Sequence, residues 1–145
     1  MLPYVLGALA AWEAGWWAER RGRRARVYAA ARAAASQLGR PLVVIGAPDA
    51  GATSGYGCGD YTVDLQRSAC PRSVVADVTR ALPFPSNSVV VFCSCVLEYV
   101  QDHRTAITEI SRVSGGWAYY VGVEPWTLAS VLYPGARRTL PPQYR

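Results

Sequence analysis

The stretch LPFPSNSVVVFCSCVLEYV, residues 82–100, decides the fold of this 145-residue chain. Pro83 and Pro85 fix the backbone φ angle and lack an amide donor, so the segment around Phe84 must be a loop. The run VVVF at 89–92 has no polar alternation, which is typical of a strand that is buried on both faces. Such strands belong to parallel sheets that are covered by helices.

A helix is predicted after this strand, because apolar residues recur there at helical spacing. These residues are Leu97, Val100, Ala106, Ile107, Ile110 and Val113. Asp102 has the short acceptor side chain of a helix N-cap. Gly115 and Gly116 are expected to end the helix, because glycine adopts the backbone conformation that closes a helix C-terminus.

Residues 76–113, ADVTRALPFPSNSVVVFCSCVLEYVQDHRTAITEISRV, resemble the middle of class I S-adenosylmethionine-dependent methyltransferases of the kind called type 11. The family pattern is an aspartate, a short spacer, LPFPDNSFDVVFCSHVLEHV and a helix that ends in E-I-x-R-V. The resemblance implies an α/β Rossmann-like fold, S-adenosylmethionine as the cofactor and methyl transfer as the reaction. It does not cover the first 40 residues.

Four further strands are predicted around the central one, at 41–45 (PLVVI), 60–65 (DYTVDL), 73–76 (SVVA) and 117–123 (WAYYVGV). In the methyltransferase frame these give a parallel sheet of about five strands in the order 3-2-1-4-5 with flanking helices. The usual family sheet adds a C-terminal β-hairpin, which we expect to be missing here.

The chain divides into an apolar N-terminal helix at 1–22, an α/β domain at 23–136 and a polar tail at 137–145. Residues 2–18 are apolar apart from Glu13, and several arginines follow directly. Three interpretations stay open for this segment: a membrane anchor, an amphipathic helix that docks on a partner or membrane surface, and an ordinary core helix. An anchor would place the domain on the reducing, cytoplasmic-type side of a membrane; otherwise we expect a cytoplasmic protein.

Residues 23–38, RRARVYAAARAAASQL, predict a second helix that Gly39 ends. In the first 40 residues, seven arginines against two glutamates account for the whole net charge of +5. The basic character is therefore local, and we expect no nucleic-acid partner.

The four cysteines, Cys58, Cys70, Cys93 and Cys95, lack the paired spacing of a zinc site and the density of a disulfide scaffold. We therefore predict that they are mostly reduced and that the chain binds no metal.

The resemblance also implies where the methionine end of the cofactor binds. In the family a D-x-G-x-G-x-G loop cradles this end, because glycine lets the backbone approach closely. Of that loop Gly46 and Gly51 are expected to remain, whereas Val44 replaces the acidic residue and Pro48 replaces a glycine. The methionine cradle is thus predicted to be rebuilt or lost.

The adenosine end is implied by residues at the ends of three strands. Asp64 matches the residue that binds the ribose hydroxyls, with a turn or capping role as the alternative. Asp77 matches the residue that meets the adenine amino group, and Val78 is expected to line the adenine pocket. Ser94 lies at the carboxyl end of the central strand, where ligands bind in open parallel sheets.

A side-chain base for the methyl acceptor is not predicted. Many relatives have a histidine at the positions of Cys95 and Tyr99, and His103 is expected to lie on the surface. Methyl transfer asks mainly for positioning, so this loss alone does not exclude the reaction. We predict a methyltransferase-like protein with impaired or lost catalysis. The alternative is a membrane-associated structural or adaptor subunit of a larger assembly that uses a pseudo-methyltransferase fold.

Overall fold

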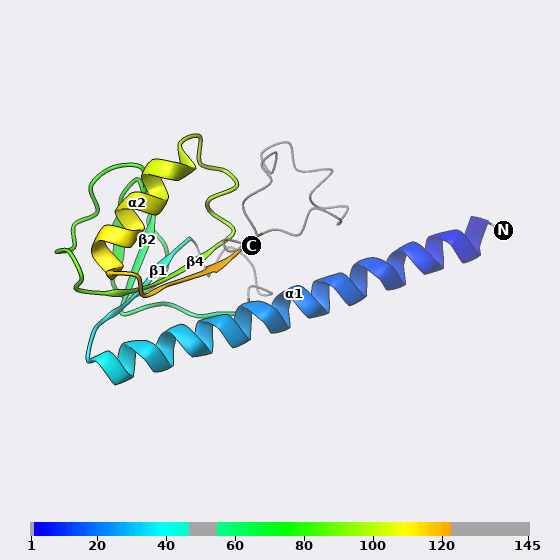
Figure 1. The fold of residues 1–145 in the computed structure, drawn as a ribbon. Helices are drawn as coiled ribbons and strands as arrows, with labels where there is room; N and C mark the ends of the chain where they lie inside the picture. Colours follow the sequence, from blue (N-terminus) through cyan, green and yellow to red (C-terminus); the bar gives the residue numbers. More distant parts are fainter. Residues whose placement is uncertain (1, 47–54, 123–145) are drawn as a thin grey trace.

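A five-stranded parallel sheet between two helices forms the protein (Figure 1). The computed structural model describes residues 2–46 and 55–122. In chain order the elements are α1 (Leu2–Leu38), β1 (Leu42–Ile45), β2 (Tyr61–Asp64), β3 (Ser73–Val75), β4 (Val90–Ser94), α2 (His103–Ser114) and β5 (Ala118–Val121).

The strand order is β3-β2-β1-β4-β5, which confirms the predicted Rossmann-like topology. In this order β1 and β4 are neighbours at the centre, and the chain leaves them toward opposite edges of the sheet. The expected absence of a terminal hairpin and the polar tail concern residues 123–145, which lie outside the described residues.

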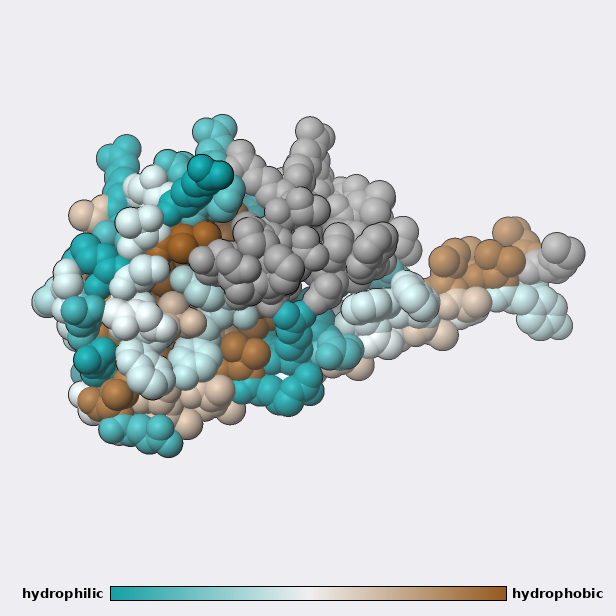
Figure 2. All heavy atoms as spheres, viewed as in Figure 1, coloured by the Kyte–Doolittle hydropathy of each residue, from teal (hydrophilic) through white to brown (hydrophobic). Residues whose placement is uncertain are grey.

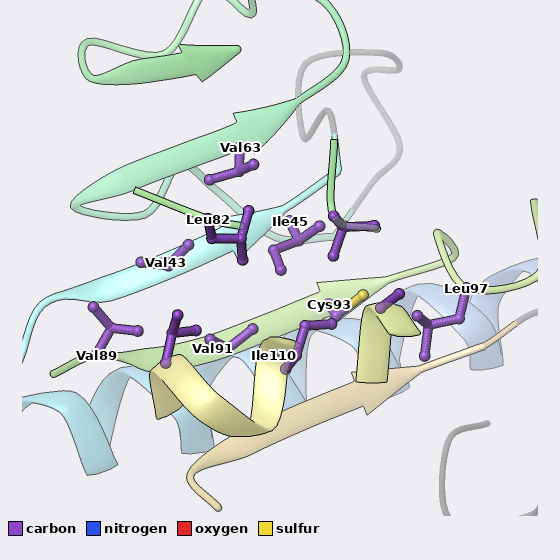
Figure 3. Close-up of a cluster of buried hydrophobic side chains, with 12 residues drawn as sticks. Val43, Ile45, Val63, Leu82, Val89, Val91, Cys93, Leu97 and Ile110 are labelled. Carbon is purple, nitrogen blue, oxygen red and sulfur yellow. The ribbon is translucent and has the colours of Figure 1, made fainter. Parts of the chain in front are cut away.

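The central strands β1 and β4 are buried on both faces, as the uninterrupted apolar runs predict. Alternate side chains enter two separate apolar clusters, because successive residues of a strand point to opposite faces. On the α2 side lie Val43, Ile45, Val91, Cys93 and Ile110, among others (Figure 3). On the α1 side lie Leu42, Val44, Val90 and Phe92.

Helix α1 covers the second face through small side chains. Ala31, Ala34 and Ala35 are buried against the sheet, and their size lets the helix backbone approach the strands closely. The two helical segments predicted at 1–22 and 23–38 form one continuous helix from Leu2 to Leu38, which Gly39 ends at a φ of +62°. The N-terminal half of α1 extends beyond the sheet (Figure 1), and its separation from the domain as a functional unit stays a prediction.

Among residues 2–46 and 55–122, no helix has both the length and the apolarity needed to cross a membrane. The membrane-spanning interpretation of residues 2–18 is therefore not supported. Glu13 lies within the apolar run, and the arginines start at Arg20, before the run reaches the usual length of a span.

Helix α2 begins after Asp102 and ends at Gly115, as the two cap residues predict, whereas Leu97 and Val100 of the predicted apolar stripe precede the helix. The side chain of Asp102 accepts a hydrogen bond from the Thr105 amide at 3.0 Å, which confirms the N-cap. Gly115 closes the helix in the left-handed conformation, with a φ of 61°.

The end of α2 holds the proline-containing loop in place. The Leu82 amide donates to Glu109 Oε1 at 2.7 Å, and Arg112 donates to the carbonyl oxygens of Leu82 and Phe84 at 3.2 and 3.1 Å. Arg112 Nε also donates to Glu109 Oε2 at 2.8 Å. The glutamate and arginine of the E-I-x-R-V motif thus satisfy backbone groups that the two prolines leave without a regular ladder.

The prediction that the cysteines are mostly reduced is wrong for one pair. Cys58 and Cys70 form a disulfide, with their Cα atoms 5.7 Å apart, whereas Cys93 and Cys95 are free. Cys58 precedes β2, and Cys70 lies in the connection that returns the chain to the start of β3. Because β2 and β3 are parallel, this return brings the two cysteines together, which their spacing along the sequence does not reveal.

We expect Glu109→Gln to lower the free energy of unfolding by about 2 kcal/mol at neutral pH, because it removes a charge-assisted contact at a mostly buried position. The hydrogen bond from Arg112 holds the pKa of Glu109 below its ordinary value of 4.5. The stabilisation is therefore present above pH 4.5 and is lost as the pH falls through the lower pKa of the folded state. Urea unfolding of both proteins at a series of pH values measures this difference.

The matched control is Glu19→Gln, which makes the same chemical change at an exposed residue of α1. It should leave the free energy of unfolding nearly unchanged. A Glu109→Gln difference that stays constant from neutral to acidic pH would contradict the assigned contact.

Candidate functional site

A pocket of about 730 Å³ opens at the carboxyl ends of the parallel strands. Its lining residues follow or end four neighbouring strands: Gly46 after β1, Asp64 on β2, Asp77 after β3 and Ser94 on β4. Ligands of open parallel sheets bind at this edge, where the connections that follow the two central strands lead to opposite sides of the sheet.

Five of the six residues predicted to bind the cofactor line this one pocket. They are Gly46, Asp64, Asp77, Val78 and Ser94. Gly51, the sixth, lies outside the described residues. The fold therefore brings together residues that span almost 50 positions of the sequence, and their role in binding stays a prediction.

Asp77 is held in one orientation by the residue two positions after it. Its Oδ1 atom accepts hydrogen bonds from the Thr79 amide at 2.9 Å and from the Thr79 hydroxyl at 2.7 Å. The side-chain hydrogen bond from Thr79 is the main reason that the pKa of Asp77 is lowered. The carboxylate therefore stays ionised at neutral pH. Its Oδ2 atom lies 3.9 Å from Arg80 Nε, a loose ion pair.

Asp64 makes the turn contact that the sequence offered as one alternative, and it also lies at the pocket, so its ribose-binding role stays a prediction. Its side chain lines the pocket, and its Oδ1 atom accepts a hydrogen bond from the Gln66 amide at 3.2 Å, which is a turn contact. Val78 and Val63 are buried in the apolar cluster of the α2 side, and both line the pocket. This part of the pocket thus has carboxylate oxygens beside an apolar wall.

Gly46 shapes the other end of the pocket. Its φ of +106° suits glycine, and an added Cβ would lie 3.0 Å from Val96 Cγ2 and 3.2 Å from the Ser94 carbonyl oxygen. The strand end of β1 therefore approaches the end of β4 closely enough to exclude a side chain. Val44, which stands at the acidic position of the family loop, is fully buried under α1, where an apolar residue fits.

Arg24 and Tyr56 are among the lining residues that were not predicted from the sequence. Arg24 reaches the pocket from α1, and its Nη2 atom donates to Cys95 Sγ at 2.8 Å. Tyr56 packs on Phe92 with ring centroids 5.0 Å apart. The sequence alone did not distinguish Arg24 from the neighbouring arginines. In the structure Tyr28, four residues later on the same helix, donates its hydroxyl hydrogen to the Cys58 carbonyl oxygen at 2.7 Å. Tyr56 stands in a glycine-rich segment that gave no signal.

The pocket has acidic and aromatic groups but lacks a base suited to neutral pH among its described residues. Burial raises the pKa of the Cys95 thiol and of the Tyr56 phenol. Cys95 also adopts a left-handed conformation, with a φ of 53°. His103 begins α2 and is not among the lining residues. Among the described residues no group of three or more potential metal-ligating side chains was found.

An open parallel sheet whose pocket lies across the tips of its central strands defines a Rossmann-like ligand-binding domain. Residues 54–120 match the family model described as a methyltransferase domain. With the observed strand order, this match supports the resemblance of these residues to class I S-adenosylmethionine-dependent methyltransferases. Comparisons with curated proteins and with solved structures gave no match.

We expect Gly46→Ala to lower the free energy of unfolding by about 1–3 kcal/mol, because alanine is strained at this φ and its Cβ crowds β4. Gly39→Ala is the matched control, since Gly39 also has a positive φ but has open space where the Cβ would lie. It should cost only about 1 kcal/mol. Urea unfolding of the two variants measures the difference; equal losses would contradict the crowding at Gly46.

Proposed function

We propose that the protein binds S-adenosylmethionine in this pocket, with the adenosine at the tips of β2 and β3 and the amino-acid end toward β1 and β4. The observation that carries the proposal is the pair of carboxylates, Asp64 and Asp77, at the tips of two neighbouring strands around one pocket. When bound, the cofactor supplies an electrophilic methyl group.

The chemistry of the two carboxylates fits the adenosine. A carboxylate accepts hydrogen bonds only, which suits the ribose hydroxyls at Asp64 and the adenine amino group at Asp77. Thr79 donates to the Oδ1 atom of Asp77, whereas the Oδ2 atom forms a loose ion pair with Arg80 at 3.9 Å and can accept from a ligand. Val78 provides an apolar surface of the kind that a purine ring requires.

We further propose that catalysis is impaired. The described lining residues hold no side chain that accepts a proton near neutral pH, since the pKa values of Cys95 and Tyr56 are raised. Such a site holds and orients an acceptor that is already nucleophilic. It gives little help to an acceptor that must first lose a proton.

A second function is favoured by the free half of α1. The large apolar side chains there are strongly exposed: Leu2, Tyr4, Val5, Leu6, Leu9, Trp12 and Trp17. Figure 2 shows the apolar end of this helix projecting from the body of the protein. An exposed apolar surface of this size marks an interaction site. We propose that it attaches the protein to a membrane surface, with the arginines that follow it near anionic headgroups, so that the domain serves as a subunit of a membrane-associated assembly.

The cofactor proposal predicts that Asp77→Asn weakens S-adenosylmethionine binding at least tenfold, because Thr79 engages the one oxygen that remains and the adenine amino group loses its charged acceptor. Asp64→Asn should have a similar effect through the ribose. Calorimetric titration measures both affinities. Glu19→Gln, which also removes a carboxylate but lies outside the pocket, is the control. A parent protein that gives no binding heat at millimolar ligand would overturn the proposal.

The attachment proposal predicts that the full-length protein sediments with vesicles of phosphatidylcholine and phosphatidylserine. The combined change Leu6→Ser, Leu9→Ser and Trp12→Ser should reduce the bound fraction at least tenfold, because each exposed side chain contributes about 1 kcal/mol or more when buried. Leu38→Ser, an exposed position at the other end of α1, is the control. Equal sedimentation of the parent and the triple variant would contradict attachment through this segment.

A further inference from the structure

Arg24 on helix α1 places a positive charge at the pocket. The guanidinium donates through Nη2 to Cys95 Sγ at 2.8 Å, and a thiol is a weak acceptor. Its Nε atom is buried and has no hydrogen-bond partner within residues 2–46 and 55–122. A buried guanidinium donor without an acceptor is costly, and the planar group is suited to bind a carboxylate through two parallel hydrogen bonds.

The position of Arg24 separates it from the two aspartates. Its partner Cys95 directly follows β4, whereas Asp77 follows β3 at the other edge of the pocket. Because the order is β3-β2-β1-β4, three spacings of neighbouring strands, about 14 Å in total, lie between these tips. The pocket thus has a negatively charged end and a positively charged end, at a separation that suits a nucleoside extended by an amino-acid chain.

We propose that Arg24 binds the carboxylate at the amino-acid end of S-adenosylmethionine. This inference rests on the proposed cofactor binding, and it assigns the binding of the amino-acid end to one residue. The glycine loop that holds this end in the family has lost its acidic residue to Val44 and a glycine to Pro48. A guanidinium from α1 supplies a donor for the ligand carboxylate.

The charges around the pocket also set the direction of the ligand. Asp64 and Asp77 repel a carboxylate from the adenosine end, and Arg24 attracts it at the opposite end. The buried Glu98 acts through its charge on Cys95 and therefore lies in the same neighbourhood. Because this negative charge of the protein also acts near Cys95, the contribution of Arg24 must be measured with a ligand pair that differs at the amino-acid end.

Calorimetric titrations with S-adenosylhomocysteine and 5′-methylthioadenosine provide this pair, since both contain the adenosine and its sulfur but only the first contains the carboxylate. We expect Arg24→Gln to weaken binding of S-adenosylhomocysteine by roughly 10- to 100-fold and to leave 5′-methylthioadenosine unchanged. Arg26→Gln is the matched control, because it removes the same charge from an exposed position of α1; it should change neither affinity.

The remaining outcomes separate the two proposals. If the parent protein binds neither ligand, the proposed cofactor binding fails and the role of Arg24 fails with it. If the parent binds both ligands, the role of Arg24 alone is overturned by either of two results: Arg24→Gln leaves the affinity for S-adenosylhomocysteine unchanged, or it lowers the affinities for the two ligands equally. Either result is also what we expect if Arg24 instead binds the carboxylate of a methyl acceptor.

Arg24→Lys guards against a variant that does not fold. It keeps the positive charge but loses the two-pronged geometry of the guanidinium. A selective loss of affinity for S-adenosylhomocysteine, smaller than that in Arg24→Gln, supports the proposal. If Arg24→Gln binds neither ligand, Arg24→Lys decides alone. The proposal is then overturned if Arg24→Lys has the same ratio of affinities for S-adenosylhomocysteine and 5′-methylthioadenosine as the parent protein.

Discussion

The burial of β1 and β4 on both faces is the constraint on which the rest of this structure depends. Val44 and Val91 are completely inaccessible to solvent although they face opposite clusters. A sheet of this composition exposes apolar area to water unless each face has a cover, and the loss would be about 25 cal/mol for each Å² exposed. Helix α2 provides one cover and the C-terminal part of α1 provides the other.

The two covers connect to the pocket in different ways. Helix α2 fixes the loop that precedes β4 through Glu109 and Arg112, and so it acts on the strand that ends in Ser94. Helix α1 packs its alanines on the sheet and continues past the strand tips, where Arg24 enters the pocket. One helix therefore sets the position of the central strand, and the other contributes directly to the surface that a ligand would touch.

Periodicity along the chain predicted the buried strands, and the resemblance to the methyltransferase family supplied their order in the sheet. The runs LVVI and VVFC have no polar alternation, so their burial on both faces and their central position follow from strand geometry. The adenosine side of the pocket was also predictable, because the resemblance pointed to Asp64 and Asp77 and the carboxyl ends of adjacent parallel strands meet at one edge of the sheet. In these cases the signal lies within one short segment, or the parallel sheet itself brings the ends of separate strands together.

Features that depend on how separate segments meet could not be predicted in this way. The Cys58–Cys70 disulfide depends on the path of the chain around β2, and cysteine spacing alone does not encode that path. Arg24 belongs to a cluster of arginines with similar local sequence, and only the packing of Ala31 and Ala35 decides which of them faces the sheet. The continuity of α1 was missed because the change from apolar to basic residues resembles a boundary.

The continuity of α1 has a consequence for communication within the molecule. Leu6 and Arg24 belong to the same uninterrupted helix, and a helix transmits a tilt along its axis with little bending. A surface that captures the free end in one orientation would thereby shift the guanidinium relative to β4. Thermodynamic reciprocity then requires that a ligand at the guanidinium alter the capture of the free end by the same factor.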